Sequence, residues 1–312
     1  MDREQAYGGP QIVGMDLHAR RSVLLRMTPE GRHLGRARID NSAAALKAQI
    51  ASAGPHPKVV LEAGYGWYWA VDTLREAGAE VHLAHPLGVK MFTYRRVKTD
   101  DRDAADLADP LRMGRLPEAW IAPPRTREVR ELVRYRHKLL TMRTSAKVQI
   151  HAVLAKAGLR VPVSDLFGRA GGDWLAQISL HGSYRTRVAS LLRLIAFLEK
   201  KEITDIEKLT AQALADDAGY RAVQTIPGIG PVFAAVMVAE IGDVTRFGGP
   251  APLCSWAGLT PRHRASDTKV RRGSITQQGS PLLRWACVEA VQRCTSDSSA
   301  AASSTTTAAS PP

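Results

Sequence analysis

Four acidic residues in the first third of the chain have the types and positions needed for metal-assisted phosphodiester chemistry. Asp16 and Glu62 each end a short apolar run that predicts a buried strand, and Asp100 and Asp103 stand three apart on a predicted helix. Carboxylate oxygens are the ligands that Mg²⁺ and Mn²⁺ prefer, and such ions stabilise both the attacking and the leaving oxygen of a phosphodiester. The alternative is that each acid is an ordinary cap or solvated residue. Their joint placement favours a metal site.

A second candidate for chemistry is Ser266, which stands among cationic residues near the C-terminus. These cations are Arg262, Arg264, Lys269, Arg271 and Arg272. Positive charge near a serine oxygen lowers the cost of forming the alkoxide and neutralises a transferring phosphoryl group. The alternative is a solvated loop serine, and no histidine–carboxylate pair is readable here to indicate a hydrolase triad. The five cations are therefore also candidate phosphate contacts.

The elements that must position the four acids form an α/β pattern over the first 115 residues. Strands are predicted at 11–16, 22–27, 34–39, 58–62 and 81–84. Helices are predicted over 44–50 with Asn41 or Ser42 as cap, over 67–77, from Pro86, and over 100–113 with Thr99 as cap. Pro110 is expected to kink the last of these helices. Three strands followed by alternating helices and strands, with a mixed sheet, resemble the RNase H-like fold.

A long basic helix is predicted over residues 126–157. Residues 116–160 hold 10 basic and 3 acidic residues, over half of the net charge of +13. Arg130, Arg134 and Lys138 are therefore candidate contacts to nucleic-acid phosphates, although a helix that packs on another and happens to be basic is the alternative. Residues 191–214 predict an antiparallel or coiled-coil partner helix, which could also be a dimer contact or a simple core helix, and 162–173 predict a loop.

The C-terminal module contains a glycine turn, residues 226–230 (IPGIG), followed by an apolar helix over 231–242. This pattern resembles a helix-hairpin-helix, in which the turn offers backbone N–H groups to a phosphate. The alternative is an ordinary tight turn between two packed helices.

Composition excludes several classes of protein. The three cysteines, Cys254, Cys287 and Cys294, have neither even pairing nor metal-ligand spacing, which argues against disulfides and structural zinc. No run approaches the roughly 20 apolar residues of a membrane span, and the N-terminus has no signal segment. We therefore expect a cytoplasmic, nucleoid-associated protein with no membrane partner. Residues 295–312 are rich in Ala, Ser, Thr and Pro and are expected to be disordered.

Two linked sets of short motifs stand in order along the chain. The first set is Gly14-Met15-Asp16, Glu62-Ala63-Gly64 and 98–104 (KTDDRDA). The C-terminal set is 226–230 (IPGIG), 240–243 (EIGD), Arg246-Phe247, 257–262 (AGLTPR), Ser266, 273–279 (GSITQQG) and Leu283-Arg284. In these motifs the chain resembles the insertion-sequence-110 type transposases, also called DEDD transposases, which are related to the Piv invertases. Two sets in the same order are far more specific than any one motif.

This resemblance implies RuvC-like movement of DNA, with the four acids as metal ligands and Ser266 as a nucleophile that becomes covalently joined to DNA. It also implies a homo-oligomer, a dimer or tetramer, and in several relatives a structured guide RNA that selects DNA by base pairing. Family members continue with helices where this chain has its low-complexity tail, so the tail is interpreted as a truncated or frameshifted end.

Together these interpretations predict an α/β plus α protein in four parts. Residues 1–115 form an RNase H-like (RuvC-like) domain, 116–215 a basic helical or coiled-coil linker, 216–294 a helix-rich serine module, and 295–312 the tail. The predicted function is that of an insertion-sequence transposase or recombinase that acts on element ends and target DNA with Mg²⁺ or Mn²⁺. The alternatives are a Holliday-junction nuclease or site-specific invertase, and an inactive nucleic-acid-binding remnant.

Overall fold

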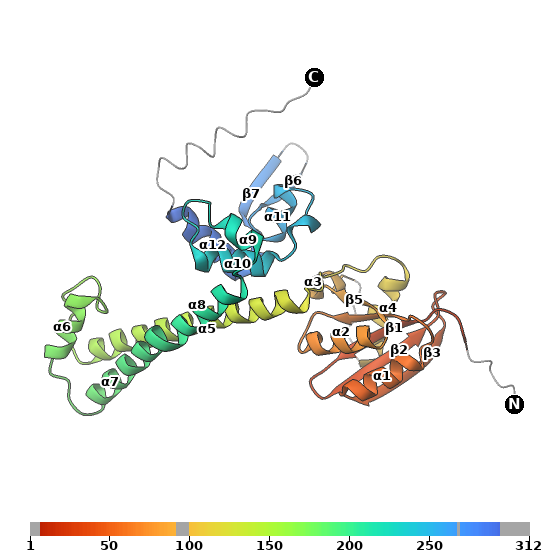
Figure 1. The fold of residues 1–312 in the computed structure, drawn as a ribbon, viewed down its shortest axis with the longest axis horizontal. Helices are drawn as coiled ribbons and strands as arrows, with labels where there is room; N and C mark the ends of the chain where they lie inside the picture. The colour runs from red at the N-terminus through yellow and green to blue at the C-terminus, as the bar shows by residue number, and fades with distance from the viewer. Residues whose placement is uncertain (1–6, 92–99, 267–268, 294–312) are drawn as a thin grey trace, which may run out of the picture. The chain divides into compact units, whose positions relative to one another are not determined.

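The computed structural model describes residues 7–91, 100–266 and 269–293 (Figure 1). The chain folds into two compact units, Met1–Ile121 and Ala122–Pro312, and each unit is described by itself. The four-part division expected from the sequence stays a prediction, and the expected tail and the Thr99 cap lie outside the described residues. No helix in the described part of the chain is long and apolar enough to cross a membrane.

The first unit is built on a five-stranded mixed sheet in the order β3-β2-β1-β4-β5. β1, β2 and β3 are antiparallel neighbours, whereas β4 runs parallel to β1 and β5 parallel to β4. The predicted sequence of three strands followed by alternating helices and strands is confirmed. The strands are β1 (Ile12–Leu17), β2 (Arg21–Met27), β3 (His33–Asp40), β4 (Lys58–Glu62) and β5 (Glu80–Ala84).

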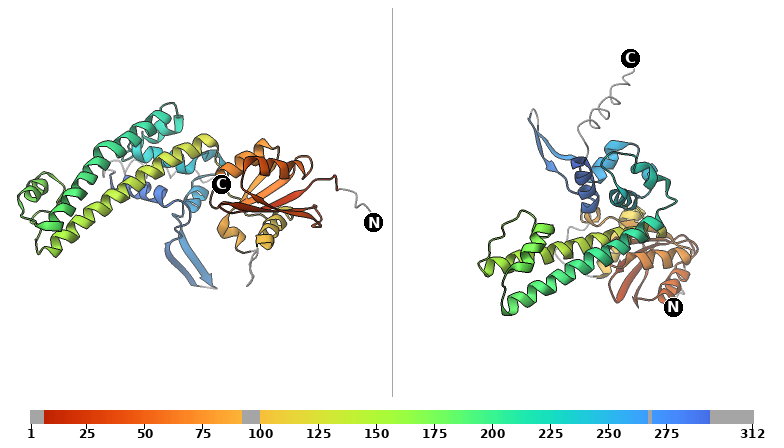
Figure 2. Two further views of the ribbon diagram at one scale, coloured as in Figure 1. Left: turned by 90° about the horizontal axis from the view of Figure 1, so that it is seen from below. Right: turned by 60° about the vertical axis from the view of Figure 1, so that its left-hand side comes forward.

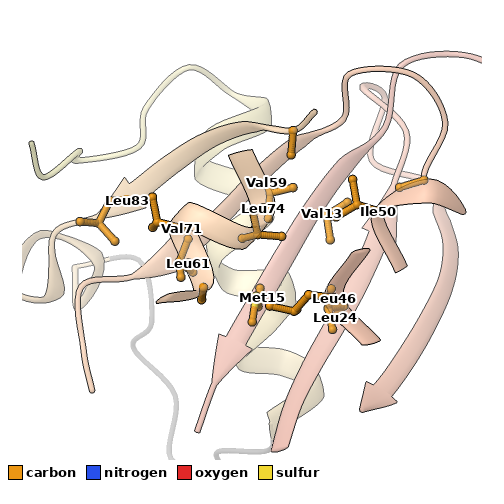
Figure 3. Close-up of a cluster of buried hydrophobic side chains, with 13 residues drawn as sticks. Val13, Met15, Leu24, Leu46, Ile50, Val59, Leu61, Val71, Leu74 and Leu83 are labelled. Carbon is orange, nitrogen blue, oxygen red and sulfur yellow. The ribbon is translucent and has the colours of Figure 1, made fainter. Parts of the chain in front are cut away.

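Helices cover both faces of this sheet. α1 (Ala43–Ala51) and α2 (Trp67–Glu76) enclose the larger core with alternate residues of the central strands, as Figure 3 shows for Val13 and Met15. α3 (Pro86–Val89) and α4 (Asp100–Arg112) contribute to the cores of the opposite face.

The predicted helix boundaries of this unit are close to those observed. The side chain of Ser42 caps α1 by accepting a hydrogen bond from the amide of Ala45, at 3.1 Å, and Pro86 opens α3. α4 continues through Pro110, which lies in its last turn, so this proline interrupts little of the helix.

The second unit begins with a helical hairpin. The 33-residue helix α5 (Pro124–Lys156) packs along a returning segment that runs beside it in both views of Figure 2. This segment consists of α7 (Gly182–Phe197), the π-helical turn η1 (Leu198–Ile203) and α8 (Thr204–Ala213). The antiparallel partner helix is therefore confirmed, although it begins at Gly182 rather than at residue 191. The predicted loop at 162–173 is wrong in part because α6 (Arg169–Gln177) begins inside it.

The rest of the second unit is a small module around α10 (Pro231–Ile241) and α12 (Pro281–Gln292), which share a core with Val129 and Val133 of α5. The glycine turn lies between α9 (Ala218–Val223) and α10, and its interpretation as a helix-hairpin-helix stays a prediction. The other elements are η2 (Val244–Arg246), α11 (Pro250–Trp256), β6 (Pro261–Ser266) and β7 (Lys269–Ile275). β6 and β7 form an antiparallel hairpin, which the prediction of a helix-rich module did not include.

Candidate active site

Asp16 and Glu62 lie at the same edge of the sheet. β1 and β4 are parallel neighbours with Met15 opposite Leu61, so the acid that follows each of these residues stands at the carboxyl end of its strand. The side chain of Asp16 is 18% exposed, whereas Glu62 is exposed. The strand pairing therefore places these two acids at the same edge of the sheet, and their role as metal ligands stays a prediction.

α4 packs against β1 at the distance of backbone contact. A Cβ placed on Gly14 would lie 1.8 Å from the carbonyl oxygen of Ala104, so a side chain at residue 14 is incompatible with this packing. Ala104 directly follows Asp103, which is half-buried, and Gly14 stands two residues before Asp16. The close contact thus fixes the turn of α4 that bears Asp103 against the strand that bears Asp16.

A polar network surrounds the loop that follows Asp16. The Nε2 atom of His18 lies 2.9 Å from Oδ2 of Asp16. The Nδ2 of Asn41 donates to the carbonyl of His18 at 2.6 Å, and the hydroxyl of Ser22 donates to Oδ1 of Asn41 at 2.6 Å. These bonds hold the turn between β1 and β2, and with it the position of the Asp16 carboxylate.

The chemistry of the predicted donors fits a hard divalent cation. Asp16, Glu62 and Asp103 all supply carboxylate oxygens, and Asp100 begins α4 on the same helix as Asp103, although its side chain lies outside the described atoms. Among the side chains that the structure describes, no group of three or more His, Cys, Asp or Glu residues is close enough to hold a metal ion. The predicted ligands therefore suit a divalent cation in the type of their donor atoms and in the position of Asp16 and Glu62 at one edge of the sheet.

Ser266 is the last residue of β6 and pairs with Lys269, the first residue of β7. Arg264 pairs with Arg271, and His263 with Arg272. Residues 264, 266, 269 and 271 belong to one set of alternating ladder positions, and three of them are cationic. The serine is thus a strand residue beside the hairpin turn rather than the residue of an irregular loop.

The predicted phosphate contacts on this hairpin are placed as follows. Arg262, Arg271 and Arg272 are exposed, and a terminal nitrogen of Arg262 donates to the carbonyl of Thr276 at 3.4 Å. The side chains of Arg264, Ser266 and Lys269 lie outside the described atoms. The three exposed arginines retain surface that a phosphate can reach.

The predicted phosphate contact at Arg130 of α5 conflicts with the structure. Arg130 is 9% exposed, and its guanidinium donates to the carbonyls of Ala239 at 2.7 Å and Glu240 at 2.9 Å. These carbonyls end α10, where a cation is favoured. The guanidinium therefore ties α5 to α10, and little of its surface is left for a nucleic acid.

The other two predicted phosphate contacts on α5, Arg134 and Lys138, differ from each other. Arg134 makes two hydrogen bonds to the carboxylate of Glu240, at 2.8 and 3.0 Å, and the side chain of Glu240 is only 3% exposed. Lys138, one turn further along, is exposed. Lys138 thus keeps the surface expected of a phosphate contact, whereas Arg134 has a structural partner.

Comparison with known proteins bears on both units. A transposase model of the DEDD type of IS110 elements matches residues 13–158, and the model of the transposase IS116/IS110/IS902 family matches residues 220–305. The two matches follow in order on one chain and together include well over half of it. The chain belongs to the IS110 family of transposases.

Several curated proteins are similar to this IS110-family chain. A probable family 20 transposase of Pseudomonas aeruginosa is 27% identical in an alignment that covers 77% of this chain and 73% of the relative. A putative transposase of Sinorhizobium fredii is 28% identical over 78% of this chain and 60% of the relative. The transposase of insertion sequence IS1328 from Yersinia enterocolitica is 25% identical over 75% and 70%. The chain thus spans between three fifths and three quarters of these relatives.

Among solved structures, RuvC of T. thermophilus in complex with a Holliday junction substrate is similar to the first part of this chain. The TM-score is 0.27 at 15% identity, over 36% of this chain and 100% of RuvC.

Several residues of the C-terminal family motifs have structural partners in this chain. Glu240 binds Arg134, and Asp243 caps η2 by accepting from the amide of Thr245 at 2.9 Å. Hydrogen bonds from Thr245 hold the pKa of the Asp243 carboxyl below its usual range. The guanidinium of Arg246 stacks over Phe247 and Trp256, at 4.2 and 4.7 Å from the ring centres.

Sequence reasoning missed three residues that position the candidate site. Gly14 and Ala104 make the contact between β1 and α4, and Arg284 holds the base of the serine hairpin. All three stand inside the motifs quoted above, next to the residues to which chemistry was assigned. The signal was the small size of residues 14 and 104 beside the acids, which predicts close packing.

Proposed function

We propose that this chain is a metal-dependent DNA transposase or recombinase in which Ser266 is the nucleophile. The observation that carries the proposal is the match of both IS110-family models, in order, on a chain whose Asp16 and Glu62 end parallel strands at one sheet edge. The match to residues 13–158 alone would support only a nuclease-like domain, and the match to residues 220–305 alone would support only a basic module.

The carboxylates of Asp16, Glu62, Asp100 and Asp103 would hold Mg²⁺ or Mn²⁺. When bound, such an ion supplies positive charge that stabilises a phosphodiester during cleavage. Asp16 suits this role because the partial burial of its side chain limits its motion. The contact of Gly14 with Ala104 fixes the backbone beside Asp103. The residues that orient the donors are thus part of the packed core.

Ser266 would form and then break a covalent bond to DNA. Its Oγ attacks the phosphorus of the phosphodiester and loses its proton, the bond from phosphorus to one DNA oxygen breaks, and that oxygen leaves as a hydroxyl after taking up a proton. A DNA hydroxyl later attacks the phosphoserine and releases the serine. The number of phosphoester bonds is conserved, so rejoining needs no external energy source.

Exposed cations would bind the phosphates of element ends and target DNA. Arg262, Arg271, Arg272 and Lys138 have the exposure that this role needs, and we expect their contribution to weaken as salt is added. A structured guide RNA, a homo-oligomer and a nucleoid location belong to the same proposal, and the family resemblance is what supports them.

The test is to incubate the purified chain, with any RNA that copurifies, with junction DNA of its element in Mg²⁺, Mn²⁺ or EDTA. We expect strand cleavage with either ion, none in EDTA, and none with Asp16→Asn. Asp40→Asn is a matched control because Asp40 also ends a strand of this sheet but is exposed and paired with Arg21, at 3.2 Å. Cleavage that persists in EDTA or in Asp16→Asn contradicts the proposal.

The same reactions separate the alternatives. Hydrolysed ends with no protein attached indicate a junction nuclease. Salt-sensitive binding without cleavage indicates an inactive remnant, provided that a full-length relative cleaves under the same conditions.

A further inference from the structure

The hairpin that bears Ser266 leaves the helical module through two short segments. Residues 257–260 lead from α11 into β6, and residues 276–280 lead from β7 into α12. Any part of the protein that fixes these two segments also fixes the direction in which the hairpin projects.

One guanidinium nitrogen joins both segments. Nη1 of Arg284 donates to the carbonyl of Ala257 at 3.1 Å, on the β6 side, and to those of Gln278 at 2.6 Å and Gly279 at 3.3 Å, on the β7 side. Arg284 is half-buried near the start of α12. Because hydrogen bonds from a charged donor are the stronger kind, this contact is well suited to hold two loops together.

Two glycines allow the segments to touch. Gly258 and Gly279 have φ values of 72° and 73°, which residues with side chains rarely adopt. A Cβ on Gly258 would lie 2.0 Å from the carbonyl oxygen of Gln278, and one on Gly279 would lie 2.3 Å from that of Trp256. Gly258 therefore faces the backbone of the other segment, Gly279 faces the backbone at the junction of α11 with residue 257, and neither position has room for a side chain.

Backbone hydrogen bonds complete this base. The amide of Gln277 donates to the carbonyl of Gly258 at 3.1 Å, and that of Thr276 to the carbonyl of Thr260 at 2.9 Å. Gln277 itself has a φ of 58°, an unusual value for a residue with a side chain. The arginine, the glycines and these amides, which we call the hairpin base, thus fix the start of β6 and the end of β7.

A small change in the direction of the hairpin at its base produces a large displacement of Ser266. Ser266 is five residues beyond Pro261, a distance of about 17 Å along a strand, so a tilt of about 10° at the base moves it by about 3 Å. A displacement of about 1 Å can cost about a hundredfold in rate when a reacting atom must be aligned. The position of the nucleophile is therefore sensitive to the hairpin base.

We propose that Arg284 is a positioning residue for Ser266, acting through the hairpin base. The inference rests on the proposed function of Ser266. The fold of α12 does not depend on this contact, because Leu282, Ala286 and Ala290 bury the helix in the core that it shares with α10. Loss of the arginine should therefore misplace the hairpin and leave the module folded.

The experiment measures the rate of covalent serine–DNA bond formation with element junction DNA over a range of DNA concentrations. For Arg284→Ala we expect the rate at saturating DNA to fall at least tenfold and the half-saturating DNA concentration to stay within twofold. Arg284→Lys should recover part of the rate, because an ammonium can reach some of the carbonyls. Gly279→Ala should show the same loss without any change of charge.

Two controls match these variants. Arg293→Ala removes a cation from the end of the same helix, where it stacks over Phe233 at 4.9 Å, and Gly248→Ala adds a methyl group where nothing lies within 4 Å. Both should keep the wild-type rate. A rate within twofold of wild type for Arg284→Ala, or an equal loss in the controls, overturns the proposal.

Hydrogen exchange of the hairpin amides separates this inference from the proposed function. In Arg284→Ala we expect the amides of β7 to exchange at least tenfold faster and those of α10 to be unchanged. If the wild-type chain forms no covalent bond, the proposed function of Ser266 fails, and exchange alone decides whether Arg284 fixes the hairpin. Unchanged exchange in β7 overturns the inference.

Discussion

Gly14 of β1 and Ala104 of α4 are in backbone contact, since a Cβ on Gly14 would lie 1.8 Å from the carbonyl oxygen of Ala104. The glycine stands two residues before Asp16, and the alanine directly follows Asp103. This single contact links the strand that carries Asp16 to the helix that carries Asp100 and Asp103, three of the four proposed metal ligands.

Gly14→Ala should therefore damage both stability and activity. The added methyl group must push α4 away from β1, which we expect to lower the free energy of unfolding by about 1–3 kcal/mol, as overpacking does. The rate of metal-dependent cleavage should fall by more than the loss of folded protein explains, because Asp103 moves with α4. Urea unfolding and the cleavage assay measure the two effects.

The control for this variant is Gly8→Ala, since nothing lies within 4 Å of a Cβ at Gly8. If Gly14→Ala has the same free energy of unfolding and the same cleavage rate as Gly8→Ala, then α4 does not pack closely on β1.

Arg134→Ala should destabilise the second unit by about 3 kcal/mol. The substitution leaves the carboxylate of Glu240, whose side chain is 3% exposed, without its two-bond partner, and an unpaired buried charge is costly. Glu240→Gln should cost less, because it removes the charge and keeps a hydrogen-bond acceptor. Both free energies can be measured by urea unfolding.

Lys138→Ala is the matched control on the same helix. Lys138 is exposed, so its removal should change the free energy of unfolding by no more than about 0.5 kcal/mol. An equally small effect of Arg134→Ala would mean that the contact with Glu240 does not stabilise the fold.

The two cysteines that the structure describes should differ in reactivity. Burial raises the pKa of the Cys287 thiol, so at pH 8 a smaller fraction of it is the reactive thiolate. Cys254 is exposed. We expect iodoacetamide to modify Cys254 faster at pH 8, and the rate at Cys287 to go on rising with pH above the usual thiol range.

Mass spectrometry of the two peptides follows both rates in one sample. In urea the two cysteines should react alike. Faster modification of Cys287 than of Cys254 in the folded chain would contradict its burial.

Apolar runs were enough to predict the central strands of the first unit from the sequence. Met15 and Leu61 are fully buried beside the two acids, and the apolar runs that contain them predicted both strands and the acid near the end of each. The contact of Gly14 with Ala104 could not be predicted in the same way, because it depends on the approach of two backbones that are far apart in the sequence.

The second unit was harder to predict because charged residues stand where the apolar residues of a typical strand would alternate. The hairpin has cationic residues at both sets of alternating positions, such as Arg271 and Arg272, so it lacks the apolar alternation of a strand. The role of Arg130 depends on the carbonyl of Ala239, which is 109 residues away. A basic helix can thus be recognised from its sequence, whereas the structural partners of its individual arginines cannot.

The most direct test of the account is a denaturing gel of the chain incubated with Mg²⁺, its copurified RNA and labelled junction DNA. We expect a covalent protein–DNA band that Ser266→Ala and Asp16→Asn both abolish. Ser274→Ala, which changes another serine on the same hairpin, should keep the band. A band that survives Ser266→Ala, or cleavage that never yields one, would contradict a serine nucleophile.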